Sequence, residues 1–154
     1  MLTLSYKLKI MAKQISTSIT INASKEKIWK ILTDFENYPE WNPFIKSITG
    51  DVKVGKHIKV KLQDMTFKPV VLTFDKNSEL KWLGNLWFKG LFDGEHRFYL
   101  RDNGNGTTHF EHSENFSGIL VGLFSKSLDK NTKKGFEMMN MELKLLRKIF
   151  PMEN

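Results

Sequence analysis

Two histidines and one glutamate occur where apolar side chains are expected, and their types suit proton transfer or hydrogen bonding to a ligand. The segment THFEHSENF, residues 108–116, alternates like a β-strand. Successive side chains of a strand point to opposite faces, so His112 and Glu114 share a face with the phenylalanines of this segment. His96 holds the same place in the preceding segment, HRFYL. All three polar groups are therefore predicted to point into an apolar interior.

The turn sequence DNGNG joins these two segments in a predicted hairpin. Because the two apolar faces must coincide, the numbers of paired residues must add to an even number. A sum of 208 pairs His96 with His112, and a sum of 210 pairs His96 with Glu114. Both registers place the three polar side chains close together on one face, and the sequence does not choose between them.

Four roles are open to this cluster. Its members can satisfy one another in a filled core. They can instead form the polar anchor of an otherwise apolar pocket, the usual design of a small-molecule site, and we favour this reading. As catalytic residues, His96, His112 and Glu114 could serve as general acid and base on a carbonyl-containing ligand. They also have the ligand types of a His₂Glu zinc site. No HExxH-like spacing accompanies them, so we expect no metal.

The composition narrows the classes of partner and chemistry. The 154 residues include no cysteine, which excludes disulfides and thiol nucleophiles. No phosphate-binding loop or nucleotide fingerprint occurs, and we expect no cofactor.

The net charge is +7, but only three of the 24 basic residues are arginine. We therefore expect no specific nucleic-acid partner. The N-terminus lacks a signal peptide's apolar core and no run is long enough to span a bilayer, so we expect a cytoplasmic protein.

The elements that must position the cluster follow from the periodicity. Residues 15–21 alternate as a half-buried strand, and Ser24 can cap a following helix. Two prolines restrict ENYPEWNPFI to a short helical corner. About six strands follow, and from Ser125 to Phe150 apolar residues recur at three- and four-residue steps in one long helix, which Pro151 ends. Consecutive hairpins give an antiparallel sheet whose apolar face only this helix can cover, so the fold class is α+β.

Alternating apolar residues indicate the inward faces of the central strands. Three such sets precede the hairpin: Ile58, Val60 and Leu62; Val70, Leu72 and Phe74; and Leu80, Trp82 and Leu86.

Two apolar segments lie outside the predicted strands. LGNLWFKGLFDG links two strands and SGILVGLF leads into the last helix. They either complete the core or form flaps around a cavity mouth, and the sequence leaves both readings open. Exposed flaps beside lysines would allow transient contact with a membrane or a protein. The residues assigned to the mouth are Trp41, which can instead pin the helical corner, and Phe44, Trp87, Phe88, Phe92 and Phe124.

Three stretches together resemble the START/Bet v-like helix-grip superfamily (SRPBCC), in its polyketide cyclase/dehydrase-like branch. These stretches are ITINASKEKIWKILTDFENYPEWNPFI, FDGEHRFYLRDNGNGTTHFEHSENFSG and the final helix. The resemblance implies a curved seven-stranded antiparallel sheet wrapped round a long C-terminal helix, with two short helices between strands 1 and 2 and a hydrophobic cavity inside. We expect residues 1–13 to be an N-terminal extension, with Met11 as an alternative start, and residues 14–151 to form a single helix-grip domain.

The resemblance leaves function open, because its members include lipid carriers, chaperone activators and cyclases. Our first expectation is a non-enzymatic protein that binds or transports a small hydrophobic ligand, such as a lipid, a quinone or a polyketide-like molecule. The alternatives are a cyclase/dehydratase-type enzyme that uses the same cavity and a chaperone-activator-like interaction module. The residues expected to bind the ligand are Trp82, His96, Phe98, Phe110, His112, Glu114, Phe116, Phe136 and Met139.

Overall fold

The computed structural model describes residues 9–63 and 65–146, and its main layer is a five-stranded antiparallel sheet of order β1-β8-β7-β6-β5. A second sheet has the order β2-β3-β4, and an isolated bridge between His57 and Val70 links the segment before β3 to β5. The strands are β1 (Met11–Ile21), β2 (Ile45–Thr49), β3 (Lys59–Leu62), β4 (Met65–Phe67), β5 (Val70–Asp75), β6 (Glu79–Asn85), β7 (Asp93–Asp102) and β8 (Thr108–Gly118).

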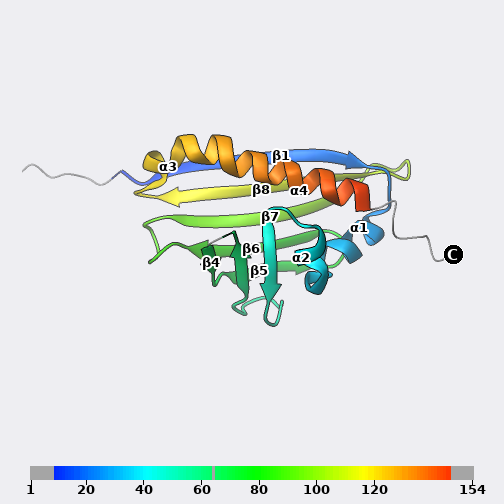
Figure 1. Ribbon diagram of the computed structural model, residues 1–154, viewed down its shortest axis with the longest axis horizontal. Helices are drawn as coiled ribbons and strands as arrows, with labels where there is room; N and C mark the ends of the chain where they lie inside the picture. Colours follow the sequence, from blue (N-terminus) through cyan, green and yellow to red (C-terminus); the bar gives the residue numbers. More distant parts are fainter. Residues whose placement is uncertain (1–8, 64, 147–154) are drawn as a thin grey trace, which may run out of the picture.

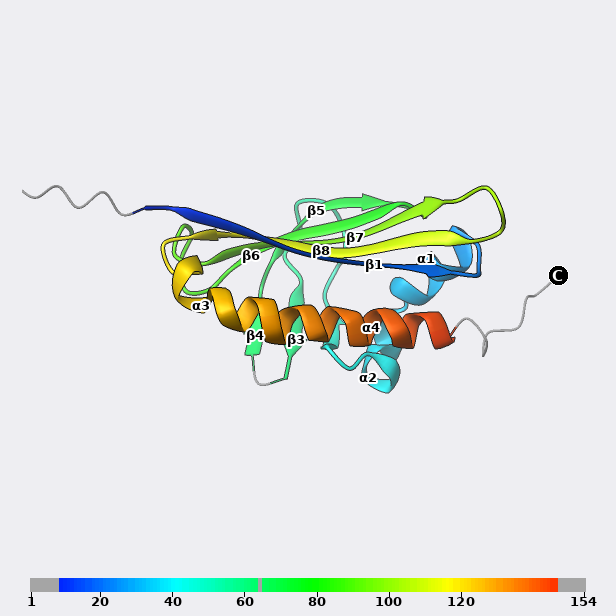
Figure 2. The ribbon, with the colours of Figure 1, turned by 90° about the horizontal axis from the view of Figure 1, so that it is seen from above.

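The helices occupy two places in the chain. Between β1 and β2 lie α1 (Lys25–Leu32), the 3₁₀-helix η1 (Phe35–Asn37) and α2 (Tyr38–Trp41). After β8 come α3 (Val121–Ser127), the π-helix η2 (Leu128–Thr132) and α4 (Lys133–Leu146). The long helix runs over β1 and β8 in Figure 1, and Figure 2 shows it along one face of the large sheet, with β3 and β4 on the same side. This arrangement confirms the α+β helix-grip prediction, although the strands divide into sheets of five and three.

The hairpin of β7 and β8 adopts the second of the two registers. His96 pairs with Glu114, and Phe98 pairs with His112. On the other side of β8, Thr17 of β1 lies opposite His112. The regular alternation of both strands therefore holds the polar cluster on the face that the long helix covers.

The inward face predicted for β5 is right at Phe74, which packs against the core, and wrong at Val70 and Leu72. A register shift between Val71 and Thr73 inserts an extra residue, so Val71 pairs with Trp82 while Phe74 pairs with Leu80. A bulge of this kind moves the residues before it to the opposite face. Val71 is therefore the buried residue at that point, in place of Val70 or Leu72.

The helical corner forms from local contacts that the sequence suggests. The hydroxyl of Ser24 accepts a hydrogen bond from the Lys27 backbone N–H, which caps α1. The buried Tyr38 hydroxyl donates to the Leu32 carbonyl over 2.6 Å, and Trp41 packs edge-on against the Tyr38 ring with centroids 5.2 Å apart. Trp41 therefore stabilises the helical corner by packing.

Two boundaries differ from the expected ones. The final helical stretch begins at Val121, earlier than Ser125, so the second half of the segment SGILVGLF is helical. Its predicted end near Pro151 lies outside the described residues. β1 begins at Met11 and pairs with β8 from that residue onward, so part of the stretch expected as an extension belongs to the sheet.

Candidate functional site

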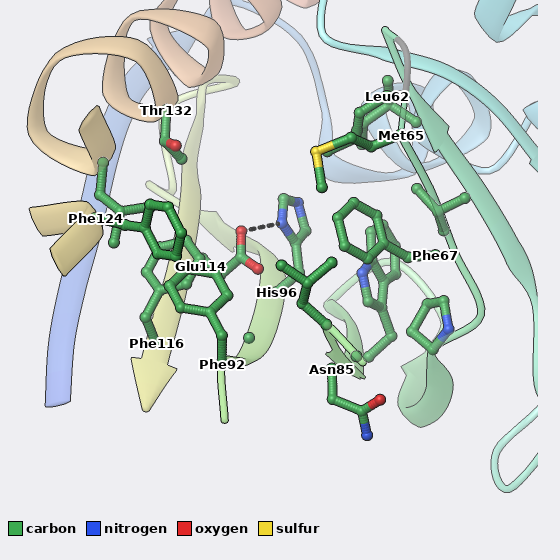
Figure 3. Close-up of a pocket in the computed structure, with 18 of the residues that line it drawn as sticks. Leu62, Met65, Phe67, Asn85, Phe92, His96, Glu114, Phe116, Phe124 and Thr132 are labelled. Atoms are coloured by element: carbon green, nitrogen blue, oxygen red, sulfur yellow. Dashed lines mark hydrogen bonds and ion pairs between the residues drawn. The ribbon is translucent and has the colours of Figure 1, made fainter. Parts of the chain in front are cut away.

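A cavity of about 280 Å³ opens between the two sheets and the long helix, and its wall is mainly apolar. The large apolar side chains that form it include Leu62, Met65, Phe67, Trp82, Phe92 and Phe116. Figure 3 shows Leu62, Met65, Phe67, Phe92 and Phe116 around the side chains of His96 and Glu114. A cavity of this size and lining is typical of a site for a small organic molecule.

The polar wall of the cavity is an imidazole–carboxylate pair. His96 Nδ1 lies 3.2 Å from Glu114 Oε2, and this contact is the dashed line of Figure 3. The side chain of Glu114 keeps 18% of its surface exposed, whereas that of His96 keeps 4%. Glu114 is thus the member of the pair that a molecule in the cavity can touch.

Gly94 makes room for this carboxylate. A Cβ atom on Gly94 would lie 2.3 Å from Glu114 Oε1, far inside van der Waals contact. Any side chain at this position of β7 would push the carboxylate out of its place. The glycine therefore sets where the second carboxylate oxygen lies.

Behind the pair, a chain of hydrogen bonds runs through the core to β1. His96 Nε2 lies 3.0 Å from His112 Nε2, and His112 Nδ1 lies 3.1 Å from Asn140 Oδ1. Asn140 Nδ2 donates to Thr17 Oγ1 over 2.9 Å, and the Thr17 hydroxyl donates to the His112 carbonyl over 3.0 Å. Every polar group of this buried chain is thereby satisfied, as the cost of burying an unpaired group requires.

His112 stays neutral at the centre of this chain. Burial lowers the pKa of His112 well below its ordinary value, and the neighbouring His96 lowers it further. The ring is stacked on Phe136, with centroids 3.8 Å apart and planes inclined by 18°. His112 therefore links the pair at the cavity wall to Asn140 without carrying a charge.

The structure separates the predicted ligand-binding residues into two groups. Trp82, His96, Glu114 and Phe116 line the cavity. Trp82 stacks on His96, with ring centroids 4.6 Å apart and planes inclined by 4°. The remaining five lie in the packed core, each with 1% or less of its surface exposed: Phe98, Phe110, His112, Phe136 and Met139. Phe136 and Met139 belong to α4, and Phe136 stacks on His112 of β8, so the contact between helix and sheet buries these residues outside the described cavity lining.

The residues predicted at the cavity mouth also fall into two groups, those that line the cavity and those that do not. Phe44, Phe92 and Phe124 line the cavity, and Phe92 packs against both Phe116 and Phe124. Trp41 belongs to the helical corner instead. Trp87 and Phe88 project from the β6–β7 loop with 71% and 63% of their surfaces exposed, so they contribute to the outer surface and not to the cavity lining.

Several residues of the site were absent from the sequence prediction. Asn140 interrupts the apolar stripe of the last helix between Met139 and Leu143, and Thr17 shares its face with the isoleucines of β1. Both are polar residues at predicted core positions, which is the signal that could have identified them. The hydroxyl-bearing Ser127, which precedes the π-helix, and Thr132, its last residue, line the cavity, and nothing in the periodicity indicates this local change of helix.

Among the residues that the structure describes, no group of three or more histidine, aspartate or glutamate side chains is arranged to hold a metal ion. In residues 9–63 and 65–146, no helix combines the length and the apolar character needed to cross a bilayer.

Comparison with known proteins gives one family match. The sequence profile of the family described as polyketide cyclase/dehydrase and lipid transport matches residues 12–144. No match was found among curated protein sequences.

Solved structures with the same fold come from bacteria and plants. A hypothetical protein from Helicobacter pylori is 15% identical, with a TM-score of 0.74 over 86% of each chain. Norcoclaurine synthase from Thalictrum flavum, solved with dopamine and hydroxybenzaldehyde, is 14% identical, with a TM-score of 0.71 over 94% of this chain and 91% of its own. A START superfamily protein from Mycobacterium smegmatis is 21% identical, with a TM-score of 0.65 over 86% of this chain and 98% of its own. At these identities the similarity shows the fold alone.

Proposed function

Because this chain belongs to the polyketide cyclase/dehydrase and lipid transport family, we propose that it binds one small hydrophobic molecule with a polar end. The observation that carries this proposal is a mainly apolar cavity whose wall holds a single imidazole–carboxylate pair, His96 and Glu114. The apolar wall would supply most of the binding free energy, and the carboxylate would orient the polar end.

The volume limits the size of this molecule. A cavity of about 280 Å³ lies at the lower end of the range of small-molecule pockets, roughly 300–1,000 Å³. This size fits a compact ring system or a medium-length chain, and it excludes complete enclosure of a lipid with two long acyl chains.

A substitution that fills the cavity tests the proposal. Leu62→Trp replaces a half-buried wall residue of β3 by a larger side chain, and it should weaken binding of small aromatic compounds at least tenfold. Leu145→Trp is the matched control, because Leu145 is exposed on α4 and does not line the cavity. Binding can be measured as ligand-dependent thermal stabilisation, since a ligand at a hundred times its Kd adds about 2.7 kcal/mol to stability. Equal stabilisation of the Leu62→Trp variant and wild type would contradict a binding site in this cavity.

Turnover in the same cavity is the second candidate function. His96 and Glu114 lie within hydrogen-bond distance of each other next to an apolar space, which is a suitable position for general acid–base catalysis on a bound carbonyl compound. The norcoclaurine synthase neighbour supports this alternative to the extent that its fold has been solved with two small aromatic compounds. If wild type converts the bound compound into a product and Glu114→Gln does not, the protein is an enzyme. If wild type releases the compound chemically unaltered, the result favours a carrier.

Transient contact with a lipid surface is a further part of the proposal. Trp87 and Phe88 are exposed on the β6–β7 loop, and Leu123 is exposed on α3. These two segments are adjacent, because the Leu120 N–H donates a hydrogen bond to the Leu91 carbonyl. We call these three side chains the apolar patch. Exposed aromatic groups next to a hydrophobic cavity, on a protein of net charge +7, suit an anionic membrane more than a protein partner.

A further inference from the structure

The donor and acceptor of each hydrogen bond behind the cavity can be deduced by starting from Thr17, the last residue of this hydrogen-bonded chain. The Thr17 hydroxyl donates its only proton to the His112 carbonyl, so Thr17 Oγ1 must accept from Asn140 Nδ2. Asn140 Oδ1 then faces His112 Nδ1 and accepts from it. His112 therefore carries its proton on Nδ1.

This tautomer fixes the orientation of His96. Since burial keeps His112 neutral, its Nε2 has a lone pair and no proton. The contact of 3.0 Å between the two Nε2 atoms can only be a hydrogen bond in which His96 donates. The remaining nitrogen of His96, Nδ1, faces Glu114 Oε2.

One proton is left for the contact between His96 and Glu114, and it can occupy either atom. If it resides on His96 Nδ1, Glu114 is a carboxylate and Oε1 carries negative charge. If it resides on Glu114 Oε2, Oε1 is a carbonyl oxygen. In both cases Oε1 accepts hydrogen bonds and has none to donate.

The surroundings of Oε1 offer nothing that would attract an anion. Oε1 lies over Gly94 at the cavity wall and has no hydrogen-bond partner among the described residues. No lysine or arginine belongs to the described lining of the cavity. The other polar side chains of that lining are Asn85, Ser127 and Thr132, which are uncharged. The cavity thus differs in kind from the lysine-rich outer surface.

We propose that the cavity selects ligands whose polar end is a neutral hydrogen-bond donor, an alcohol or a phenol, and rejects carboxylates of the same shape. This inference rests on the proposed function, because it specifies the ligand of the same cavity. A donor would complete the coordination of Glu114 Oε1. A carboxylate would face an acceptor that it cannot bond, and only the uncharged donors of Asn85, Ser127 and Thr132 would be there to replace part of its hydration.

Three naphthalene derivatives of matched shape test the selection: 2-naphthol, 2-methoxynaphthalene and 2-naphthoate. Their size falls within the range that the cavity volume allows. With the full-length protein near pH ~7.5, where the carboxylate is ionised, we expect 2-naphthol to bind at least tenfold more tightly than 2-naphthoate. The methyl ether, which has the shape but no donor, should lie between them. Isothermal titration calorimetry measures all three directly.

Glu114→Gln tests whether this carboxylate is the source of the selection. An amide offers a donor as well as an acceptor, so the ratio of the 2-naphthol and 2-naphthoate affinities should fall to within about threefold. Glu95→Gln is the control, because Glu95 is adjacent to His96 on the opposite face of β7 and pairs with Lys81. This control should keep the wild-type ratio. A Glu114→Gln variant that also keeps it would overturn the assignment to Glu114.

The wild-type titrations remain decisive if the Glu114 variant fails to fold. Repeating them in two buffers of different ionisation enthalpy reports proton uptake, and 2-naphthol should bind without any. Tight binding of 2-naphthoate without proton uptake would overturn the inference and leave the cavity as a binding site, provided that Leu62→Trp abolishes it. Failure of all three compounds to bind would overturn the inference and count against the proposed function at this ligand size.

Discussion

His112 shows how a titratable residue can be built into a core without its charge. Its ring has no exposed surface, both nitrogens have hydrogen-bond partners, and its face stacks on Phe136. The buried ring cannot accept a second proton without either breaking a hydrogen bond or carrying charge in an apolar environment. The physical consequence is a link between folding and pH.

Stability should therefore fall with acidification. In the unfolded chain His112 protonates near its ordinary pKa of about 6.5, whereas the folded protein holds the pKa of His112 well below that value. Below pH ~6.5 the unfolded state binds more protons, so the free energy of unfolding decreases as the pH falls. Between pH ~7.5 and ~5.5 this residue should account for a loss of about 1.4 kcal/mol. Urea denaturation at both pH values measures the loss.

Two variants isolate the contribution of His112 from that of other groups. His112→Gln should reduce the acid-induced loss by about 1.4 kcal/mol, even if its stability at neutral pH is lower. His109→Gln, on the outer face of the same strand, should leave the loss as in wild type. Equal pH dependence of the His112 variant and wild type would show that His112 titrates normally in the folded protein.

At the scale of elements, the sequence predicts those that obey a simple period. β7 and β8 alternate without a bulge, so the common inward face of His96, His112 and Glu114 could be predicted before their register was known. β5 could not be predicted in this way, since its bulge shifts the faces in the middle of a six-residue strand. β4, with three residues, is too short to show a period.

The candidate site was predictable only in part, for a similar reason. Trp82 and Phe116 could be assigned to the cavity because they share the inward faces of their strands with the polar cluster. Phe136 and Met139 lie on the inward face of the long helix and were assigned to the cavity for the same reason, yet they belong to the packed core. The difference depends on where the long helix approaches the sheet closely, which is a property of tertiary packing and has no counterpart in a local pattern.

Gly135 determines this close approach between the long helix and the segment before β2. A Cβ atom on Gly135 would lie 2.4 Å from Cδ2 of Phe44, whose ring packs edge-on against Phe136 with centroids 5.2 Å apart. In an exposed helix, Gly→Ala adds about 1 kcal/mol of stability. At Gly135 we expect a net destabilisation of about 1 kcal/mol or more, because the Phe44 ring must move out of a packed position. Chemical denaturation of Gly135→Ala measures this difference.

The same substitution in α3 provides the control. The nearest atom to a Cβ on Gly122 is Sδ of Met11, at 2.7 Å, and Met11 is a flexible and partly exposed side chain that can turn away. Gly122→Ala should therefore be neutral or stabilising. If Gly135→Ala were as stable as Gly122→Ala, the contact with Phe44 would not limit helix packing. Because Phe44 also lines the cavity, the Gly135 variant should bind small ligands more weakly.

At the scale of the whole molecule, exposed apolar side chains and lysines lie on the β6–β7 loop and α3, the two segments that also supply Phe92 and Phe124 to the cavity lining. Trp87 has a positive φ of 66°, an uncommon conformation for a residue with a side chain, and it directs its ring outward with 71% of its surface exposed. Lys89 follows in the same loop, and Lys126 lies one turn beyond Leu123 on α3. The segments that carry the apolar patch and these lysines, the β6–β7 loop and α3, lie at the same end of the molecule in Figures 1 and 2.

This arrangement predicts reversible binding to anionic membranes. Insertion of exposed aromatic side chains into a bilayer interface contributes about 1.5–3 kcal/mol each when they are fully buried, and lysines add electrostatic attraction to anionic lipids. Wild type should therefore cosediment with vesicles of equal parts phosphatidylcholine and phosphatidylglycerol, and binding should weaken in high salt. The double substitution of Trp87 and Phe88 by serine should lower the partition coefficient at least tenfold. Val54→Ser, an exposed apolar residue of the β2–β3 connection, is the control and should have no effect.

The effect of vesicles on ligand transfer tests whether the apolar patch serves to load or unload the cavity. If the patch serves to load or unload the cavity, vesicles should accelerate transfer of 2-naphthol between protein molecules, and the double variant should lose this acceleration while its affinity for 2-naphthol in solution stays unchanged. Both measurements are needed, because the patch residues Trp87 and Phe88 lie outside the described cavity lining. Equal sedimentation of wild type and the double variant would contradict membrane docking through this surface. The aromatic side chains would then be available for a protein partner, and the positive charge alone would account for any residual attraction to anionic vesicles.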